Sequence, residues 1–316
     1  MNEQVDRAGR LLGEAGHVTV LTHERPDGDA VGSLLGLSVA LRAADKQVAS
    51  VMPGGVPGRY RFLPGADQVE KELPDRTDLL IAVDCAADDR FGLDLTSLPR
   101  EPDINVDHHP TNTAFAEVNI VEEGAAATTE MLYELLPKWG LELSSSVASS
   151  LLAGLLTDTI GFRTSSTTAR TLRVAADLVD LGAPLADIYD RALSQMSFVA
   201  AHYWGGGLSR LEHDDGLVWT ALTQEDRKRV GYPGADDADL VNLLMTIEEA
   251  EVVVLFVEQP NDQVKVSWRA EPGVDVSEVA AEFGGGGHRP AAGAMIEGQL
   301  EQVQERVLRA TRKAMG

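Results

Sequence analysis

Short apolar runs alternate with longer amphipathic segments through most of the chain. The runs are rich in Val, Ile and Leu, which favours buried strands, and the longer segments repeat apolar residues at helical spacing. This alternation predicts a parallel sheet with crossover helices. The predicted strands are residues 17–22, 47–52, 78–83, 104–107 and 116–120. The predicted helices are residues 30–44, 126–139, 147–160, 168–181 and 185–192, and the Gly- and Pro-rich residues 53–58 are a predicted loop.

The helical periodicity weakens after residue 192, where Gly205-Gly206-Gly207 predicts a flexible break. We expect a first domain over residues 1–192, a linker over 193–206 and a smaller second domain over 207–316. The second domain should carry a hairpin, two further strands and three helices on a small mixed sheet. Its hairpin is predicted at 208–213 and 217–222, its strands at 251–257 and 263–268, and its helices at 236–246, 275–283 and 300–315. The fold class is therefore α/β, a parallel-sheet domain followed by a smaller mixed-sheet α/β domain.

Acidic and imidazole side chains gather where these predicted elements end. Because the carboxyl ends of parallel strands share one edge of a sheet, we expect these side chains to converge. The clusters are His23, Asp27 and Asp29 after the first strand, Asp84 after the third, Asp107-His108-His109 after the fourth, and Asp158 near the end of the helix 147–160. Taken singly, each cluster is equally well explained as a turn, a helix cap or a surface loop. Their joint position at element ends favours a metal site.

The number of candidate ligands predicts two divalent cations. Oxygen and imidazole donors suit Mg²⁺ or Mn²⁺, and the set is larger than one ion needs. Asp27, Asp29, Asp84 and Asp158 would repel one another without cations. Cys85 is the only cysteine, so it forms no internal disulfide and no thiolate cluster, and we interpret it as a buried small residue rather than a nucleophile.

In the order of these motifs the chain resembles the DHH/DHHA1 phosphoesterases, of the stand-alone oligoribonuclease and pAp phosphatase type often called nanoRNase. The resemblance implies that His23, Asp27 and Asp84 hold one ion, and that Asp29, Asp84, His108 and Asp158 hold the other, with Asp84 bridging. It implies Mn²⁺, with Mg²⁺ as the alternative. Asp107 is then expected to orient an imidazole, and His109 to face the phosphate as a catalytic group, although a structural surface histidine is the alternative for His109.

A downstream motif resembles the nucleotide-binding motif of the accessory domain. It comprises Gly284 to Gly287 with His288, followed by Ala291-Ala292-Gly293. Glycine lets backbone N–H groups approach an anion closely, although four glycines also suit a mobile loop. The substrate-binding residues expected from this motif and its surroundings are Gly285, Gly286, Gly287, His288, Arg289, Arg269 and, after the fourth motif, Arg163. Ala270 stands where the family usually has serine. The hydrogen bond that this serine would make to the substrate is therefore not expected here.

Charge and hydropathy limit the substrate and the location. The net charge of −23 argues against a basic track for long nucleic acid and favours mononucleotides or short oligonucleotides. There is no apolar run near 18 residues, so we expect no membrane helix. The polar start Met1-Asn2-Glu3-Gln4 is unlike a signal peptide, so a cytoplasmic location is expected.

The expected activity is metal-dependent hydrolysis of di- to pentaribonucleotides and of 3′-phosphoadenosine 5′-phosphate (pAp). A cyclic di-AMP or pApA phosphodiesterase is the alternative that the sequence does not separate. An inorganic pyrophosphatase of the same superfamily is disfavoured, because the chain carries the glycine-His motif of residues 284–288. A nucleotide-binding regulator would require a missing ligand, and all ligand positions are filled. Expected partners are short RNA, nucleotide bisphosphates, or linear or cyclic dinucleotides, and the sequence leaves open whether the chain forms a homodimer.

Overall fold

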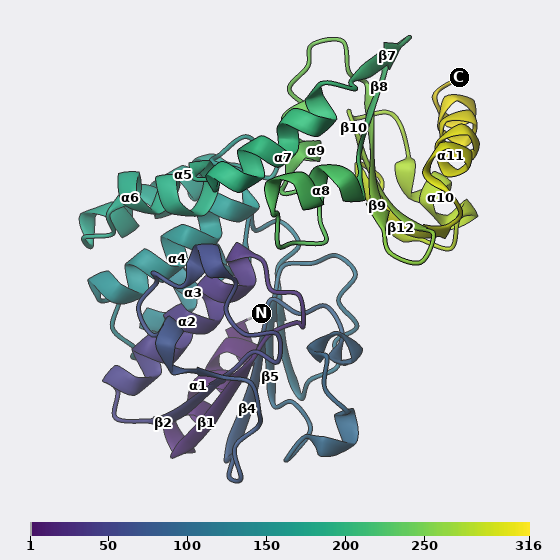
Figure 1. The fold of residues 1–316 in the computed structure, drawn as a ribbon. Helices are drawn as coiled ribbons and strands as arrows, with labels where there is room; N and C mark the ends of the chain where they lie inside the picture. The colour runs from purple at the N-terminus through teal and green to yellow at the C-terminus, as the bar shows by residue number, and fades with distance from the viewer. Residues whose placement is uncertain (1) are drawn as a thin grey trace. The chain divides into compact units, whose positions relative to one another are not determined.

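The computed structural model describes residues 2–316, which divide into two compact units (Figure 1). The first unit ends at Gln195 and the second begins at Met196. This division falls inside the range 193–206 that the sequence suggested for a linker.

The first unit is built on a parallel sheet of six strands in the order β3-β2-β1-β4-β5-β6. The chain runs from β1 outward to β3 and then returns to the other side of β1 with β4. The strand order therefore reverses between β1 and β4, which is where open α/β sheets bind ligands. The strands are β1 (His17–Leu21), β2 (Gln47–Val51), β3 (Val69–Glu70), β4 (Leu79–Val83), β5 (Ile104–Asp107) and β6 (Val118–Val121).

Six α-helices complete the first unit, with α2, α3 and α4 lying beside the sheet in Figure 1. They are α1 (Asn2–Glu14), α2 (Gly28–Ala43), α3 (Thr128–Lys138), α4 (Ser145–Asp158), α5 (Ala169–Asp180) and α6 (Leu185–Tyr189), which continues as a π-helical turn, Asp190–Ser194. Short 3₁₀ turns cover Gly58–Tyr60, Ala66–Gln68, Asp88–Phe91 and Leu95–Ser97. The main hydrophobic core lies between these helices and the sheet.

Helices α2 and α4 pack with their backbones unusually close. A Cβ added to Gly28 would lie 2.1 Å from Thr157 Oγ1, and one added to Gly32 would lie 2.5 Å from the Ser150 carbonyl oxygen. Gly36, four residues further on, meets Leu151 in the same way. Residues spaced by four lie on one helix face, so α2 presents a stripe of glycines to α4. This packing brings the first turn of α2 beside the last turn of α4.

The second unit is a mixed sheet of six strands in the order β11-β12-β10-β9-β8-β7. Only β8 and β9 pair in parallel. The strands are β7 (Glu212–Asp214), β8 (Leu217–Leu222), β9 (Val252–Gln259), β10 (Gln263–Ala270), β11 (Gly286–His288) and β12 (Ala291–Glu297). The helices are α7 (Phe198–Leu208), α8 (Gln224–Val230), α9 (Leu240–Leu244), α10 (Val276–Glu282) and α11 (Leu300–Met315).

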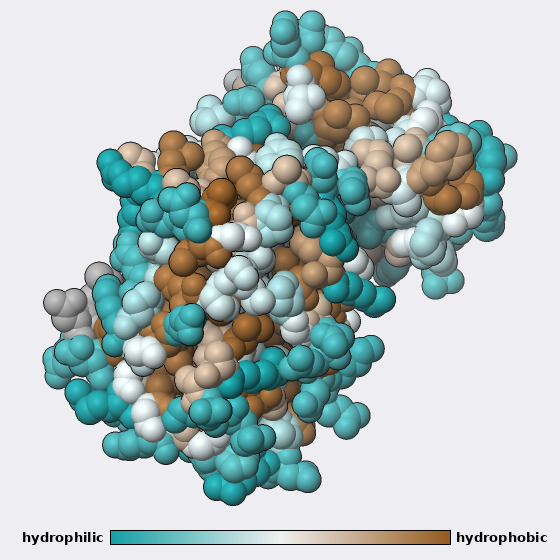
Figure 2. All heavy atoms as spheres, turned by 90° about the vertical axis from the view of Figure 1, so that its left-hand side faces the viewer, coloured by the Kyte–Doolittle hydropathy of each residue, from teal (hydrophilic) through white to brown (hydrophobic). Residues whose placement is uncertain are grey.

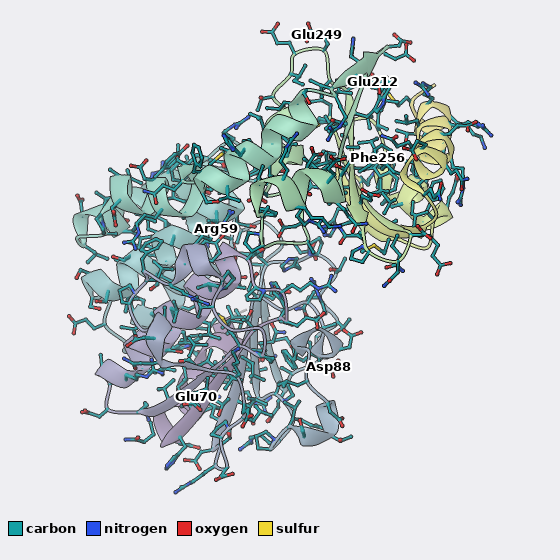
Figure 3. The ribbon with its side chains drawn as sticks, viewed as in Figure 1. Arg59, Glu70, Asp88, Glu212, Glu249 and Phe256 are labelled. Carbon is teal, nitrogen blue, oxygen red and sulfur yellow. The ribbon has the colours of Figure 1, made fainter. Side chains whose placement is uncertain are left out.

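This second sheet has a hydrophobic core on each face. Phe256 of β9, labelled in Figure 3, is fully buried in the core that β9 shares with α10 and α11. Tyr203 of α7 and Leu240 of α9 belong to the core on the other face. Covering both faces with helices explains why β8 and β9 are almost entirely buried.

The sequence-based expectations differ from the structure in several places. The flexible break expected at Gly205-Gly206-Gly207 was wrong, because these residues lie within helix α7. A Cβ on Gly206 would lie 2.6 Å from Asp226, so close packing rather than flexibility explains the glycine. The helix expected over 236–246 shortens to α9, because Ala238 and Asp239 take left-handed backbone angles. The Gly-rich segment, for which a mobile loop was the alternative interpretation, contains strand β11.

Several large hydrophobic side chains remain exposed on α5 and α6, among them Leu172, Val179, Leu185 and Tyr189. Figure 2 shows brown hydrophobic residues among teal polar ones on the helix-covered side of the first unit. Within residues 2–316, no helix combines the length and the apolar character that crossing a membrane requires.

Candidate metal centre

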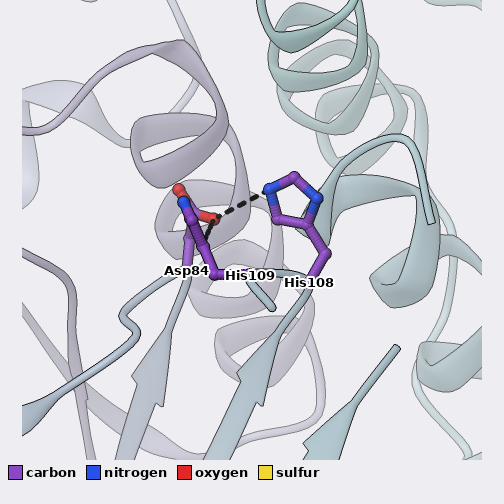
Figure 4. Close-up of side chains that lie close together, drawn as sticks. All are labelled: Asp84, His108 and His109. Atoms are coloured by element: carbon purple, nitrogen blue, oxygen red, sulfur yellow. Dashed lines mark ion pairs between the residues drawn. The ribbon is translucent and has the colours of Figure 1, made fainter. Parts of the chain in front are cut away.

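Asp84 occupies the centre of the cluster at the point where the strand order reverses. It follows β4 directly, is buried, and has a left-handed backbone φ of 52°. Its carboxylate lies 3.8 Å from His108 Nε2 and 3.7 Å from His109 Nδ1, the two ion pairs drawn in Figure 4. His23 Nε2 approaches the other carboxylate oxygen to 3.9 Å. The Thr128 hydroxyl donates to Asp84 Oδ1 over 2.9 Å and fixes the carboxylate.

Asp29 is held rigidly in the first turn of α2. One of its oxygens accepts from the Thr128 backbone N–H at 2.6 Å, and the other accepts from the N–H and hydroxyl of Thr129 at 3.1 and 2.6 Å. The start of α3 thus supplies the donors that orient this carboxylate. Asp29 is almost fully buried, and one of its carboxylate oxygens lies within 4.8 Å of ligand atoms of His108 and Asp158.

His108 connects the carboxylates of α4 and β4. Its Nδ1 lies 3.2 Å from the Ala125 carbonyl oxygen, which leaves Nε2 to face Asp84 and Asp158. Nε2 lies 3.5 Å from Asp158 Oδ2 at the last residue of α4. A carbonyl bond to one ring nitrogen is the usual way to orient a metal-binding imidazole.

Asp27 has two roles at the start of α2. Its Oδ1 accepts from the backbone N–H groups of Asp29 and Ala30, both at 3.1 Å, so it caps the helix. Its carboxylate also lies within 4.8 Å of ligand atoms of His23 and Asp84. The alternative interpretation as a helix cap is therefore correct for Asp27 and does not exclude ligation.

Three groups of side chains are spaced to hold a metal ion: His23, Asp27 and Asp84; Asp29, His108 and Asp158; and Asp84, His108 and His109. Within each group, the ligand atoms all lie within 4.8 Å of one another. All six side chains proposed as ligands from the sequence belong to at least one group. The donors are carboxylate oxygens and imidazole nitrogens, which suit hard and borderline divalent cations.

The pKa values of three carboxylates in this cluster are raised, so their ionised forms are destabilised. Burial raises the pKa of Asp158 to about 8, and the charges of Asp29 and Asp27 act in the same direction. Burial, followed by repulsion from Asp29, holds the pKa of Asp84 well above its usual range. Burial also raises the pKa of Asp29, with His108 opposing it. Divalent cations would relieve this repulsion, so the residues present fit two metal ions.

His109 lies nearer to Asp107 than to Asp84. Its Nδ1 donates to Asp107 Oδ1 over 2.7 Å, and Asn112 Nδ2 donates to the other Asp107 oxygen over 2.7 Å. Burial alone would raise the pKa of Asp107, but these two bonds outweigh it and lower the pKa. The bond from Asp107 in turn raises the pKa of His109.

Cys85 takes no part in this chemistry. Its thiol is fully buried and donates to the Ala87 carbonyl oxygen over 3.1 Å. Burial raises the pKa of the thiol to about 12, so it stays protonated.

Sequence reasoning missed Thr128, Thr129 and Asn112, which orient Asp29, Asp84 and Asp107. Threonines at the start of a helix normally read as capping residues, and an Asn in a loop as a turn residue. Only their contacts with distant carboxylates reveal a role in the site.

Arg269 lies on β10 in the second unit, on the face opposite Ala270. Residues alternate between faces along a strand, so Arg269 shares its face with Ser267 and Lys265. Its guanidinium donates to the Trp268 carbonyl oxygen over 2.9 Å. Ala270 packs in the hydrophobic core, so a serine there would not point toward the same side as Arg269.

The Gly-rich motif forms β11, which pairs with β12 in antiparallel register. A Cβ on Gly285 would lie 2.2 Å from the Gly293 carbonyl oxygen, and one on Gly287 would lie 2.5 Å from the Ala291 carbonyl oxygen. A Cβ on Gly286 meets nothing within 4 Å. Close strand packing thus explains two of the glycines and leaves Gly286 open on the surface.

The remaining candidate binding residues are exposed. His288 ends β11, and Arg289 pairs with Asp275 over 3.0 Å. Arg163 lies in the turn after α4, where its backbone N–H donates to the Thr159 carbonyl oxygen over 2.8 Å. None of these three belongs to the groups that are spaced to hold a metal.

Comparison with known proteins identifies both units. Residues 17–155 match the model of the DHH family N-terminal domain, and residues 229–315 match that of the DHHA1 domain. A protein of Thermus thermophilus, named bifunctional oligoribonuclease and PAP phosphatase NrnA, is 40% identical over 95% of this chain and 90% of its own length. The Bacillus subtilis protein of the same name is 28% identical over 87% of this chain and 87% of its own length.

A solved structure also shares the whole fold. The exopolyphosphatase-related protein of Bacteroides fragilis has a TM-score of 0.91 and 25% identity, covering 99% of this chain and 96% of its own. Manganese-bound RecJ of Thermus thermophilus, with a TM-score of 0.58 and 15% identity, shares the fold over 99% of this chain and 55% of its own. From the two domain models and the extent of these matches, the chain belongs to the DHH family and carries a DHHA1 domain.

Proposed function

We propose that this protein is a two-metal phosphoesterase that hydrolyses short oligoribonucleotides and pAp to mononucleotides. The proposal rests on three neighbouring sets of acidic and imidazole side chains, two of which contain Asp84. They lie where the strand order reverses in the first unit. The names of the relatives that match nearly the whole chain support this substrate class.

His23, Asp27 and Asp84 would hold one ion, and Asp29, Asp84, His108 and Asp158 the other, with Asp84 shared. Mn²⁺ is the proposed metal and Mg²⁺ the alternative, because imidazole and carboxylate donors are mixed in both sets. When bound there, two such ions would supply an activated water for attack on phosphorus and positive charge near the phosphoryl oxygens.

His109 and Asp107 are the proposed catalytic pair beside the metals. Asp107 stays ionised because its pKa is lowered. It therefore accepts a hydrogen bond from His109 Nδ1–H, which fixes the orientation of the ring. The opposite nitrogen, Nε2, is then free to donate a proton to the leaving oxygen. The raised pKa of His109 keeps that proton available near neutral pH.

The second unit would contribute groups that bind the nucleotide. We propose Arg269, His288, Arg289 and the backbone of Gly285 to Gly287, with Arg163 of the first unit, as substrate-binding residues. Arg269→Ala or His288→Ala should then impair turnover of a short oligonucleotide more than that of an aryl phosphodiester. Equal losses on both substrates would remove the case for these binding roles.

Hydrolysis of cyclic di-AMP or of its linear product pApA is the second candidate. The supporting observation is a match to cyclic-di-AMP phosphodiesterase GdpP of Geobacillus thermodenitrificans, 26% identical over 92% of this chain but only 47% of that protein.

One comparison of substrates tests these proposals. Purified protein with Mn²⁺ or Mg²⁺ is assayed on pAp, pApA, cyclic di-AMP, pyrophosphate and a long single-stranded RNA, with Asp84→Asn as the inactive control. The proposal expects the highest kcat/KM on pAp and short linear oligonucleotides. Preferred turnover of pyrophosphate or of long RNA would contradict it, and tight nucleotide binding without any turnover would indicate a regulator. Sedimentation of the same sample tests whether the protein forms a homodimer.

A further inference from the structure

A cavity of about 300 Å³ lies in the first unit where the chain leaves β2. This volume is at the lower end of the range for small-ligand sites. Its lining includes Gly54, Gly55, Val56, Arg61, Asp67 and Lys71. We call it the Arg61–Lys71 cavity.

Two cations without carboxylate partners line this cavity. Arg61 Nε donates to the Val56 carbonyl oxygen over 3.3 Å, which ties the guanidinium to the cavity wall. The ammonium end of Lys71 lies over Gly55, with Nζ 3.9 Å from where a Cβ would stand. Among residues 2–316, no carboxylate comes within ion-pairing distance of either cation, and Asp67 is the one acid in the lining.

This excess of positive charge is unusual in a chain with 50 acidic and 27 basic residues. Two cavities of the second unit show the opposite balance. Glu225, Glu258, Asp262 and Glu301 outnumber Lys228 in one, and Asp214, Asp215 and Glu251 outnumber Arg312 in the other. The Arg61–Lys71 cavity is therefore suited to an anion, whereas those two are not.

The cavity opens at the same edge of the sheet as the metal centre. β2 pairs in parallel with β1, so both strands end at the same edge of the sheet. A Cβ on Gly54 would lie 2.9 Å from the carbonyl oxygen of Glu24, the residue after His23. Neighbouring strands are about 4.8 Å apart, so the exit of β2 lies about one strand spacing from the end of β1 and about two, roughly 10 Å, from the end of β4.

We propose that the Arg61–Lys71 cavity binds a second phosphate of the substrate. This phosphate would be the one next to the scissile bond in a short oligonucleotide, or the uncleaved phosphate of a 3′,5′-bisphosphonucleoside. The guanidinium and ammonium supply charge-assisted donors, and the exposed glycine loop lets the phosphate approach the backbone. The inference rests on the proposed function and adds a specificity determinant within the first unit.

Steady-state kinetics on two substrates test this proposal. For Arg61→Ala and Lys71→Ala, KM for pApA should rise roughly 10-fold or more, the size expected for loss of a charged hydrogen bond. The kcat for pApA should stay nearly constant. Turnover of bis(p-nitrophenyl) phosphate, which carries a single phosphate, should not change. Asp67→Asn should act in the opposite direction and lower KM for pApA.

Arg76→Ala is the matched control, because it removes an exposed cation just before β4 begins, at the opposite edge of the sheet. It should leave both substrates unaffected. If Arg61→Ala and Lys71→Ala change the two substrates equally, or change neither, the second-phosphate site is wrong while the proposed function stands. A wild-type protein that turns over neither pApA nor pAp would overturn the proposed function and this site with it.

Discussion

The His109 ring and the Asp107 carboxylate form a fixed pair, joined by a 2.7 Å bond from Nδ1 to Oδ1. Asn112 holds the second Asp107 oxygen, so the carboxylate cannot rotate away. The pair places a proton on a defined nitrogen of an imidazole that lies next to the metal cluster. Its energetic consequence is the raised pKa of His109.

Replacing Asp107 by Asn should therefore move the pH dependence of catalysis. The raised pKa keeps His109 protonated to higher pH, so losing the carboxylate should shift the alkaline limb of kcat to lower pH. We expect kcat near neutral pH to fall roughly 100-fold, within the range for a general acid. The metal content should stay close to two ions per chain.

Asn112→Ala is the companion variant for this pH profile. It removes one bond to Asp107 but keeps the negative charge beside His109, so a smaller shift in the same direction is expected. A profile for Asp107→Asn that coincides with the wild type would mean that His109 does not titrate in the reaction.

A substitution of Asp84 leaves the backbone unchanged only if the new residue tolerates the left-handed backbone conformation at this position. Its φ of 52° is tolerated by Asn far better than by Ala. Asp84→Asn should keep the fold but lose metal occupancy and reduce kcat/KM by about 100-fold or more. Elemental analysis and thermal unfolding measure the two effects, and Asp84→Ala should unfold at lower temperature than Asp84→Asn. Full activity with two bound ions in Asp84→Asn would disprove the shared-ligand role.

The stability of the metal-free protein should depend on pH through Asp158. Its folded-state pKa of about 8 lies above the ordinary value of 3.8, so the folded protein binds a proton that the unfolded chain has released. Stability is then greatest below pH 4 for this group and is lost as the pH rises toward 8. In the presence of a chelator, Tm should be lower at pH 8 than at pH 6.

Asp158→Asn should flatten this dependence and raise Tm of the metal-free protein at pH 8. Added Mn²⁺ should stabilise the wild type much more than this variant. A chelated wild type whose Tm is the same at pH 6 and pH 8 would show that the carboxylates of the cluster are not crowded without metal.

The three glycines of the β11 motif should respond differently to a single methyl group. Gly285→Ala and Gly287→Ala place Cβ against backbone oxygens of Gly293 and Ala291, so both should lower the free energy of unfolding by about 1–3 kcal/mol. Gly286→Ala has open space and should leave Tm nearly unchanged. If nucleotides approach this backbone, KM for pApA should nonetheless rise in Gly286→Ala. Unchanged KM there would restrict the motif to a structural role.

Five of the six strands in the first unit could be predicted within about two residues, because each is a short Val-, Ile- or Leu-rich run between loops. The two-residue strand β3 is too short to show such a pattern and was missed. Strands β11 and β12 escaped prediction because Gly and Ala carry little strand preference. Helix α8 escaped because its charged residues show no apolar face. For the site, titratable side chains at strand ends were visible in the sequence. Thr128 and Thr129 were not, since their partner Asp29 lies about a hundred residues away.

The glycine stripe of α2 links two properties that are usually separable. A methyl group at Gly32 would push α4 outward and carry Asp158 away from Asp29, and one at Gly154 would meet Asp29 Oδ1 at 2.8 Å. The thermal stability of the protein and the spacing of the metal ligands thus depend on the same close contacts between α2 and α4. A wider or narrower distance between the two metal positions therefore requires that α2 and α4 be redesigned together. Replacing one of these glycines by a larger residue would change both the stability and the ligand spacing.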